Sequence, residues 1–316
     1  MTSRPPGARV RTVFLGSGDF GRPALRRLVA HPAIRLAGVV TAPARPVGRR
    51  QIVTPTPIAA LATELGVKTV LTPHRLRTPE SVAAVLALDP GLLVLADYGQ
   101  IVPGALLDLR HGALNLHPSL LPRHRGAIPV PAAILAGDVL TGVTLMRMDA
   151  GLDTGPVVAQ SQRAIPPNAT APTLQAALEE DAAALLDAHL DAWLAGERPA
   201  VPQSPAGVTL TRPLRRDDGR LDAGRPAAEL ERQVRAYQPW PGSFLELDGE
   251  RIVVAVASVS PSAPGDVPGK LVMDRAHPAV ATTEDRLVLE SVTPAGRRTM
   301  SGAEWLRGRR VSESPR

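Results

Sequence analysis

Between Gly112 and Pro122 the chain reads Gly112-Ala113-Leu114-Asn115-Leu116-His117-Pro118-Ser119-Leu120-Leu121-Pro122, and this stretch decides the fold. Its small and apolar beginning, Gly112 to Leu114, predicts a short buried strand. Asn115 and His117 then stand two residues apart at the carboxyl end of that strand, with their side chains on one face. Because open α/β sheets bind ligands beyond the carboxyl ends of their strands, we expect both side chains at a ligand site.

A carboxylate follows further along the chain, in Leu152-Asp153-Thr154-Gly155. An amide, an imidazole and a carboxylate together can transfer a carbonyl fragment to an amine without a covalent intermediate. Each residue alone has an ordinary explanation, since Asn115 and Asp153 can form turns and His117 can be a hydrogen-bonded histidine. Their combination in this order favours a catalytic site formed by Asn115, His117 and Asp153.

Strands and helices are predicted to alternate before this stretch. We expect strands at residues 9–15, 34–40, 68–71 and 91–96, and helices from the turn after Leu15 to about residue 29, at 58–65 and at 78–88. Later strands are expected at 141–148 and 157–165, and a long helix at 171–194. Residues 41–57 are expected to form a long loop. The alternation predicts a Rossmann-like α/β domain with a mostly parallel sheet and crossover helices.

A segment rich in proline and glycine, residues 196–206, predicts a linker. Beyond it the pattern changes to one helix at 227–236 and short strands at 243–247, 251–257, 269–273 and 286–292. Short strands at close spacing, separated by proline and glycine turns, favour a small β-barrel. The sequence therefore predicts a catalytic domain over 1–195, a linker over 196–206 and a second domain over 207–316.

The composition limits the function. The 316 residues include no cysteine, which excludes disulfides, thiolate nucleophiles and cysteine-bound zinc, and no spacing typical of metal ligands is present. No apolar run approaches the ~20 residues that cross a membrane. Residues 1–11 have no apolar segment behind them, so we expect no secretory signal, no membrane partner and a cytoplasmic protein.

The charge is basic and unevenly distributed. The formal net charge is +6, and residues 297–310 carry five arginines against Glu304. Such a distribution permits a polyanionic partner. Aromatic residues make up 3% of the chain, so contacts with phosphates are favoured over stacking on bases.

One motif indicates a different kind of site. Gly16-Ser17-Gly18-Asp19-Phe20-Gly21 is a G-x-G-x-x-G sequence between a predicted strand and a predicted helix. A dinucleotide site would also need an acidic residue at the end of the second strand, where the chain reads Val39-Val40-Thr41-Ala42. The simpler interpretation is a tight turn.

Several blocks resemble those of the methionyl-tRNA formyltransferase family, over about residues 13–310. They are Arg45 to Arg49, Asp97 to Pro103, Asn115 to Gly126, Met148 to Gly155, Gln238 to Gly242 and Pro294 to Met300. The chain departs from the family pattern at Ser17-Gly18, where Thr-Pro is usual, and at Asp222-Ala223, where Asp-Trp is common. Arginines also replace lysines in the two basic segments.

The resemblance implies transfer of the formyl group of 10-formyltetrahydrofolate to the α-amine of initiator methionyl-tRNA, for translation initiation. It implies an OB-like second domain, a monomer and no metal. Folate contacts are expected from Tyr98, Gly99, Gln100, Ile101 and Val102, and from Ser119, Leu120, Leu121 and Pro122. Contacts with tRNA are expected from Arg45, Arg49, Arg50, Arg297 and Arg298.

In this chemistry Asn115 would donate to the oxyanion of a tetrahedral intermediate, and His117 would donate to it or accept the amine proton. Asp153 would orient His117 or a water, and would raise the pKa of His117. His124 is expected on the surface. Two other classes remain open. One is a formyltransferase or hydrolase that acts on a nucleotide sugar, a glycinamide ribonucleotide or water; the other is a non-enzymatic RNA-binding protein.

Overall fold

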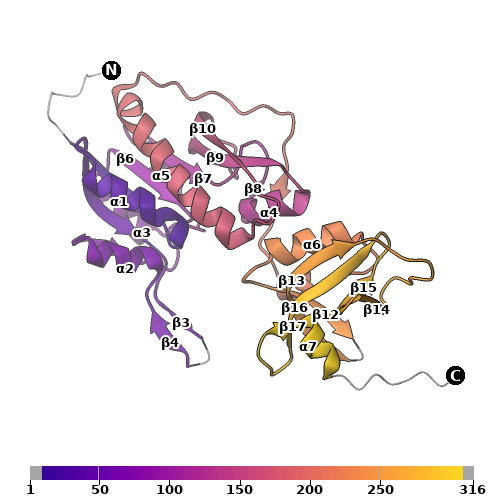
Figure 1. Ribbon diagram of the computed structural model, residues 1–316. Helices are drawn as coiled ribbons and strands as arrows, with labels where there is room; N and C mark the ends of the chain where they lie inside the picture. Colours follow the sequence, from indigo (N-terminus) through magenta and orange to yellow (C-terminus); the bar gives the residue numbers. More distant parts are fainter. Residues whose placement is uncertain (1–8, 49, 248, 309–316) are drawn as a thin grey trace. The chain divides into compact units, whose positions relative to one another are not determined.

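The computed structural model describes residues 9–48, 50–247 and 249–308 (Figure 1). The chain divides into two compact units. Unit 1 contains residues 1–129, 139–164 and 175–212, and unit 2 contains 130–138, 165–174 and 213–316. The predicted boundaries at 195/196 and 206/207 stay a prediction.

Unit 1 is built on one seven-stranded sheet with the order β10-β9-β7-β6-β1-β2-β5. The strands are β1 (Val10–Leu15), β2 (Ile34–Val40), β5 (Val70–Leu71), β6 (Leu92–Ala96), β7 (Ala113–His117), β9 (Leu140–Arg147) and β10 (Val157–Ala164). The five strands from β7 to β5 run parallel, and β9 and β10 form an antiparallel edge. The predicted mostly parallel α/β fold is confirmed.

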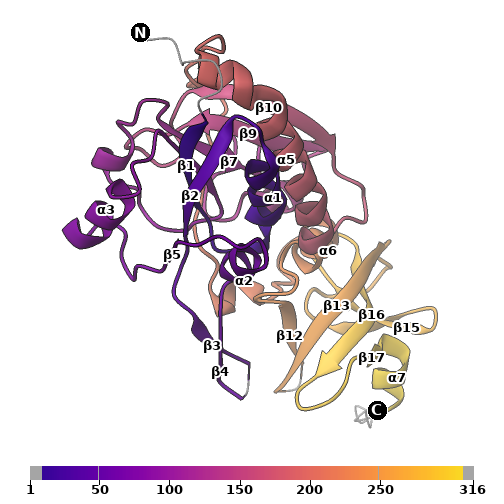
Figure 2. The same cartoon turned by 90° about the vertical axis from the view of Figure 1, so that its left-hand side faces the viewer.

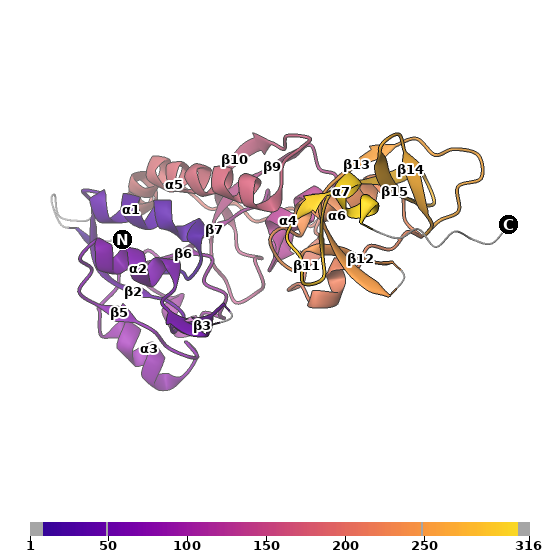
Figure 3. The ribbon, with the colours of Figure 1, turned by 60° about the horizontal axis from the view of Figure 1, so that its bottom comes forward.

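Helices cover both faces of this sheet. They are α1 (Arg22–Ala30), α2 (Pro57–Glu64), α3 (Pro79–Leu86) and α5 (Ala171–Ala195). Helices α1 and α5 lie on one face and α3 on the other (Figures 2 and 3). Val13 and Leu15 of β1 pack with Val85 of α3, whereas Phe14 points to the opposite face because successive strand residues alternate. Such burial on both faces is typical of a parallel sheet.

Two parts of unit 1 differ from the sequence prediction. The expected loop over 41–57 contains an antiparallel ribbon formed by β3 (Arg45–Val47) and β4 (Ile52–Thr54). Its strands have only three residues each and every one is exposed, so no pattern of alternating burial marks them. The connection from β6 to β7 contains a short 3-10 helix, η2 (Gly104–Leu106), in place of a crossover α-helix.

Short elements near the site were also missed. They are η1 (Asp19–Gly21), α4 (Pro129–Ala136), and β8 (Arg125–Gly126), which pairs in parallel with β11 (Leu210–Thr211). The residues of the predicted linker lie on unit 1 rather than apart from it: Val201 and Val157 exchange backbone hydrogen bonds of 2.7 and 2.8 Å. This segment is therefore ordered by contacts with the sheet edge.

Unit 2 contains an antiparallel sheet with the order β12-β13-β16-β15-β14, and β17 pairs with β16. Its elements are η3 (Arg216–Gly219), α6 (Ala227–Ala236), β12 (Ser243–Leu247), β13 (Glu250–Ser260), β14 (Leu271–Asp274), β15 (His277–Ala281), β16 (Arg286–Pro294), β17 (Met300–Ser301) and α7 (Gly302–Arg307). Leu230 of α6 and Trp305 of α7 pack on Leu289 and Ile252 of the sheet. The predicted separate β domain is confirmed, with β15 and α7 added to it.

Candidate active site

Strand β7 places two of the predicted catalytic residues. Asn115 and His117 are its third and fifth residues and point to the same side, because strand side chains alternate. Both neighbours of β7 hold it, since Asn115 pairs with Leu95 of β6 and with Met146 of β9. A strand fixed on both sides positions its terminal side chains more rigidly than a loop would.

Asp153 reaches this strand from the turn between β9 and β10. The Nδ1 atom of His117 lies 3.7 Å from Oδ2 of Asp153, and the exposed fractions of the two side chains are 6% and 14%. The same oxygen accepts a hydrogen bond of 2.8 Å from the backbone N–H of Gly126. The structure therefore brings His117 and Asp153 together, with Asn115 two residues away on the same face.

The proton position on His117 follows from its other nitrogen. Nε2 lies 2.9 Å from the carbonyl oxygen of His124. A carbonyl oxygen only accepts, so Nε2 carries a hydrogen and donates it. In the neutral ring Nδ1 then has a lone pair that faces the carboxylate of Asp153. A proton that arrives at Nδ1 is stabilised by that carboxylate.

Two opposing effects determine the pKa of His117. Burial lowers it below the ordinary value, and this effect outweighs the raising effects of Asp153 and of the hydrogen bond to the His124 carbonyl. At neutral pH the ring is therefore uncharged and can accept a proton. The expected raising effect of Asp153 on this pKa is present, but burial, which the sequence does not reveal, determines the net direction.

His124 is also placed differently from the prediction. It was expected on the surface, but it is 6% exposed. Its backbone N–H donates to Oγ1 of Thr209 at 2.7 Å, and its carbonyl accepts from His117. The reason is the β8–β11 pairing, which covers this turn with a segment more than 80 residues further along the chain.

Gln203 is a site residue that the sequence analysis missed. From the predicted linker it donates to the carbonyl oxygens of Asp153 and Gly155 at 2.8 and 2.7 Å. Its Oε1 accepts from Arg125 at 2.7 Å. Gln203 thus holds the Asp153 turn against the segment after β7. Nothing in the composition of a linker indicates such a role.

The segment after His117 is tied to the antiparallel edge of the sheet. Ser119 is fully buried and donates to the carbonyl of Arg123 at 2.7 Å. Thr144 accepts from the backbone N–H of Leu121 at 3.1 Å, and Gln160 donates to the carbonyl of Leu121 at 2.9 Å. These bonds hold the loop; contacts of Ser119, Leu120, Leu121 and Pro122 with a folate stay a prediction.

The second predicted folate segment follows β6. The Oε1 of Gln100 accepts from the N–H of Leu76 at 2.7 Å, and Tyr98 and Val102 pack into the core. Burial raises the pKa of Tyr98 to about 12. Ile101, by contrast, is 75% exposed, and Gly99 adopts a positive φ of 73°. The segment therefore presents its backbone and the Ile101 side chain to solvent at the carboxyl edge of the sheet.

The predicted tRNA contacts lie in two exposed segments. Arg45 and Arg50 belong to the β3–β4 ribbon, and Arg49 lies outside the described residues. Arg297 and Arg298 are exposed in the turn between β16 and β17. The ribbon also exposes Val47, Ile52 and Val53, which were not predicted.

Asp97 is a further acidic group at the ligand edge of the sheet. It follows β6 directly. The residue as a whole is exposed, but its carboxylate lies against Gly18 of the turn after β1. Partial burial of the carboxylate, together with the negative charges of Asp19 and Glu179, raises the pKa of Asp97 to about 6. Perturbed carboxylates of this kind gather at functional sites.

The raised pKa predicts a pH-dependent gain in stability for Asp97→Asn. Above pH ~6 the folded protein holds an unfavourable charge, whereas below the unfolded value of 3.8 the group is protonated in both states. Urea unfolding at about pH 8 should show a gain of about 1 kcal/mol, reduced from the full shift by solvent screening, and the gain should vanish near pH 4. An equal gain at both pH values would contradict the charge explanation.

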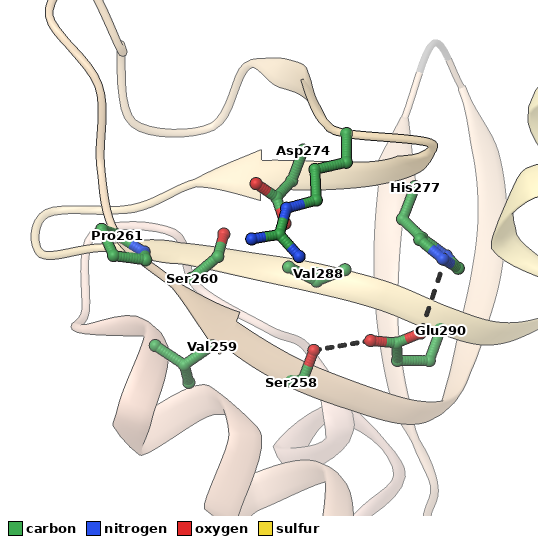
Figure 4. Close-up of a pocket in the computed structure, with 9 residues that line it drawn as sticks. Ser258, Val259, Ser260, Pro261, Asp274, His277, Val288 and Glu290 are labelled. Atoms are coloured by element: carbon green, nitrogen blue, oxygen red, sulfur yellow. Dashed lines mark hydrogen bonds and ion pairs between the residues drawn. The ribbon is translucent and has the colours of Figure 1, made fainter.

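A cavity of about 440 Å³ lies in unit 2 (Figure 4). Ser258 donates to Glu290 at 2.6 Å, and His277 lies 3.6 Å from the same carboxylate. Asp274 and Arg275 also line it. None of the predicted catalytic or folate-binding residues lines this cavity.

Residues 9–48, 50–247 and 249–308 were compared with the geometry of metal-ligand clusters and of membrane-spanning helices. In those ranges no three histidine or acidic side chains gather as metal ligands do. Within the same ranges, none of the helices has the length and apolar character needed to cross a bilayer.

Comparison with known proteins also divides the chain into an N-terminal and a C-terminal part. A family profile described as formyl transferase matches residues 10–190, and one described as formyl transferase, C-terminal domain, matches residues 213–310. A methionyl-tRNA formyltransferase of Chloroflexus aggregans is 43% identical over 302 residues, which cover 95% of this chain and 97% of that protein. One of Myxococcus xanthus is 41% identical, over 96% of this chain and 97% of that protein.

Solved structures share the fold at low sequence identity. An N-formyltransferase from Helicobacter canadensis, in complex with folinic acid and dTDP-3-aminofucose, has a TM-score of 0.64 at 13% identity, over 89% of this chain and 98% of that chain. HypX from Aquifex aeolicus, in complex with tetrahydrofolic acid, has a TM-score of 0.58 at 16% identity, over 95% of this chain and 47% of that chain.

Proposed function

The chain belongs to the formyl transferase family, and within it to the methionyl-tRNA formyltransferases, and we propose on that premise how its residues perform the reaction. The donor is 10-formyltetrahydrofolate and the acceptor is the α-amine of initiator methionyl-tRNA, which places the protein in translation initiation. The single observation that carries the proposal is the buried His117–Asp153 pair, 3.7 Å apart, at the carboxyl end of β7.

The reaction begins with attack of the neutral amine on the formyl carbon. In the tetrahedral intermediate the formyl oxygen becomes an oxyanion, and the side-chain amide of Asn115 is the donor suited to it. The nitrogen that attacks becomes positively charged and must lose a proton. His117, held neutral by burial, takes this proton at Nδ1.

Asp153 assists His117 in this scheme. Its carboxylate stabilises the imidazolium that forms during proton transfer, and the hydrogen bond from Gly126 fixes its orientation. The proton then passes to the folate nitrogen as the carbon–nitrogen bond of the donor breaks. His117 is thereby regenerated in its neutral form, and no covalent intermediate with the protein is needed.

We place the folate at the two segments that follow β6 and β7. The support is the exposed Ile101, the open backbone at Gly99 and their position at the carboxyl edge of the sheet, where α/β folds bind ligands. Two relatives in fold have been solved with folinic acid or tetrahydrofolic acid, which favours a folate for this chain as well.

The proposed RNA contacts divide between the ribbon and unit 2. The exposed Arg45 and Arg50 stand on a two-stranded ribbon, and Arg297 and Arg298 stand on a turn of unit 2. The ribbon is suited to positioning the aminoacylated end of the tRNA, and the turn of unit 2 is suited to binding its phosphates. We also propose that the protein is cytoplasmic, because aminoacylated tRNA and folate are available there. We propose that it acts as a monomer.

Charge removal in unit 2 should weaken every tRNA alike. The double substitution Arg297→Ala and Arg298→Ala should reduce affinity for initiator and elongator tRNA to the same degree, because phosphate contacts do not depend on sequence. The slope of log K against log salt should also flatten, by roughly 0.7–0.9 for each lost contact. Filter binding at several salt concentrations measures both effects.

The double substitution Arg220→Ala and Arg225→Ala is the matched control for this experiment. It also removes two positive charges from unit 2, but Arg220 is neutralised by Glu246 and Arg225 by Glu229, each at 2.8 Å. An unchanged slope is expected for the control. Equal flattening for both variants would show that net charge matters, and that the β16–β17 turn has no special role.

The choice of acceptor is tested by initial rates with competing amines. The purified chain is given 10-formyltetrahydrofolate with initiator methionyl-tRNA, elongator methionyl-tRNA or dTDP-3-aminofucose, and release of tetrahydrofolate is followed. The proposal predicts the highest kcat/KM for the initiator species. Preference for the amino sugar, or release of formate with no acceptor, would favour a sugar formyltransferase or a hydrolase instead.

A further inference from the structure

A carboxylate lies beside the glycine-rich turn formed by residues 16–21. It does not come from the second strand, where a dinucleotide site would have it. The second strand, β2, ends without an acidic residue. Asp97, directly after β6, provides it instead, and the backbone N–H of Ser17 donates to the Asp97 carbonyl at 2.9 Å. Asp97 adopts a φ of 51°, in the left-handed region that few non-glycine residues enter. Such conformations are frequent at functional sites.

Gly18 is required by this arrangement. A Cβ atom at position 18 would overlap Oδ2 of Asp97 and would lie 2.9 Å from its Cγ. Any other residue, including the proline that usually stands at this point of the family pattern, would turn the carboxylate away. The departure at Gly18 and the presence of Asp97 are therefore one feature: the glycine makes room for the acid.

The charges around the turn determine what it can bind. Asp19 lies in the turn itself, and both Asp19 and Glu179 act on the Asp97 carboxylate. Arg22 is close enough to pair with Asp19, at 3.4 Å in an exposed position. With this excess of negative charge the turn repels a phosphate, so the usual ligand of a G-x-G-x-x-G turn is disfavoured. A neutral group that donates a hydrogen bond is favoured.

The position of Asp97 relates it to the catalytic strand. Ala96 of β6 pairs with Leu116 of β7, so Asp97 and His117 follow at the ends of neighbouring strands, which lie ~4.8 Å apart. The carboxylate points to Gly18, on the β1 side of β6. An acceptor whose amine lies at His117 must therefore extend across the end of β6 to reach this carboxylate.

We propose that Asp97 is a specificity-determining residue that accepts a hydrogen bond from the free hydroxyl of the terminal ribose in the charged RNA. This inference rests on the proposed function, because it takes the acceptor to be an aminoacyl ester of a ribose. A carboxylate is the group that reads ribose hydroxyls beside glycine-rich turns, and a hydroxyl is the neutral donor nearest to the esterified amino acid. Acceptors that place a phosphate at this point are rejected.

The test uses charged initiator tRNA whose terminal ribose has hydrogen in place of the hydroxyl that is not esterified, with the normal substrate for comparison. The ratio of kcat/KM for the two substrates measures the hydroxyl contact. We expect the wild-type protein to prefer the normal ribose by about tenfold to hundredfold, because a carboxylate left without its donor is costly. Asp97→Ala should act on both substrates at nearly the same, lower rate.

Gly18→Ala provides a second variant that keeps the acid. It should lose the preference as Asp97→Ala does, because the added Cβ turns the carboxylate away. Restored thermal stability near pH 4, where the charge of Asp97 has no effect on stability, in the double variant Gly18→Ala with Asp97→Ala, relative to Gly18→Ala, would confirm the steric conflict. The preference of the wild-type protein should also decline below pH ~6, where Asp97 is protonated, whereas that of Asp97→Asn should not change with pH.

The possible outcomes separate the two proposals. Failure of the wild-type protein to formylate either RNA would overturn the proposed function. Equal formylation of both RNAs by the wild-type protein, or a full preference retained by Asp97→Ala, would overturn the role of Asp97 and leave the proposed function intact. A loss of rate in Asp97→Ala with the preference unchanged would indicate that Asp97 contacts the α-amine instead.

Discussion

Asp153→Asn and His117→Ala are each expected to lower single-turnover formyl transfer by at least ~10²-fold, with tRNA affinity within about threefold of the wild type. Both side chains act on a proton that moves only during the reaction, so binding of the RNA does not depend on them. His117 supplies the accepting nitrogen, and Asp153 stabilises the charge that this nitrogen acquires. Rapid-quench assays with excess protein, together with filter binding, measure the two quantities separately.

The pH profile distinguishes this role from a structural one. In the wild type the rate should decline on acidification with an inflection below the ordinary histidine value, because burial lowers the pKa of His117. Asp153 opposes that shift, so Asp153→Asn should move the inflection to still lower pH. The matched control is Asp149→Asn: Asp149 accepts from Thr154 at 2.7 Å and holds the same turn without facing His117. A loss as large in the control would assign the effect to the turn.

Asn115→Ala should reduce the rate by ~10²–10³-fold, the usual effect of losing one donor to an oxyanion. The side chain lies at the carboxyl end of β7, and a strand held on both sides limits how far it can move. The loss should appear in kcat, with little change in KM for the folate or the tRNA, because the oxyanion exists only in the intermediate.

Asn115→Asp is the informative companion variant. It keeps the shape of the side chain but replaces the N–H donor with a negative charge, so its rate should fall at least as far as that of Asn115→Ala. A near-normal rate for either variant would remove Asn115 from the reaction. A rise in KM without a change in kcat would instead make Asn115 a binding residue.

Much of unit 1 could be predicted from the sequence because its strands are short apolar runs between turns. Strand β6 consists of five buried residues and β7 begins with two, and buried parallel strands carry just this signal. Asn115 and His117 were predicted as site residues because they stand at the end of such a strand, and Asp153 because it adds a chemically complementary carboxylate; their roles stay a prediction. The 3.7 Å separation of His117 and Asp153 depends on tertiary packing, and the sequence could predict only that the two are near each other.

The parts that could not be predicted depend on contacts between distant segments. The ribbon of β3 and β4 is exposed on both faces, so no periodic burial marks it. His124 is buried by the β8–β11 pairing, and Gln203 reaches the Asp153 turn from a segment whose composition indicates a linker. The pKa of His117 depends on burial, which a list of neighbouring charges does not reveal.

Asp97 shows how a departure from a family pattern can carry information. Taken alone, Gly18 is a missing proline and Asp97 an additional acid in a predicted folate segment. The structure brings the two together, since a Cβ at position 18 would overlap the carboxylate. No periodicity or motif links residues 79 positions apart, so this pair could only be recognised in the folded chain.

The central claim is that the chain joins a formyl group to the α-amine of methionine on the initiator tRNA, and the product tests it most directly. The purified protein is incubated with 10-formyltetrahydrofolate and charged initiator tRNA, the tRNA is digested with ribonuclease, and the methionyl-adenosine is analysed by mass spectrometry. The account predicts that this fragment gains the mass of one formyl group, in proportion to the tetrahydrofolate released, and that His117→Ala prevents the gain. Release of tetrahydrofolate with an unmodified methionyl-adenosine would contradict the account.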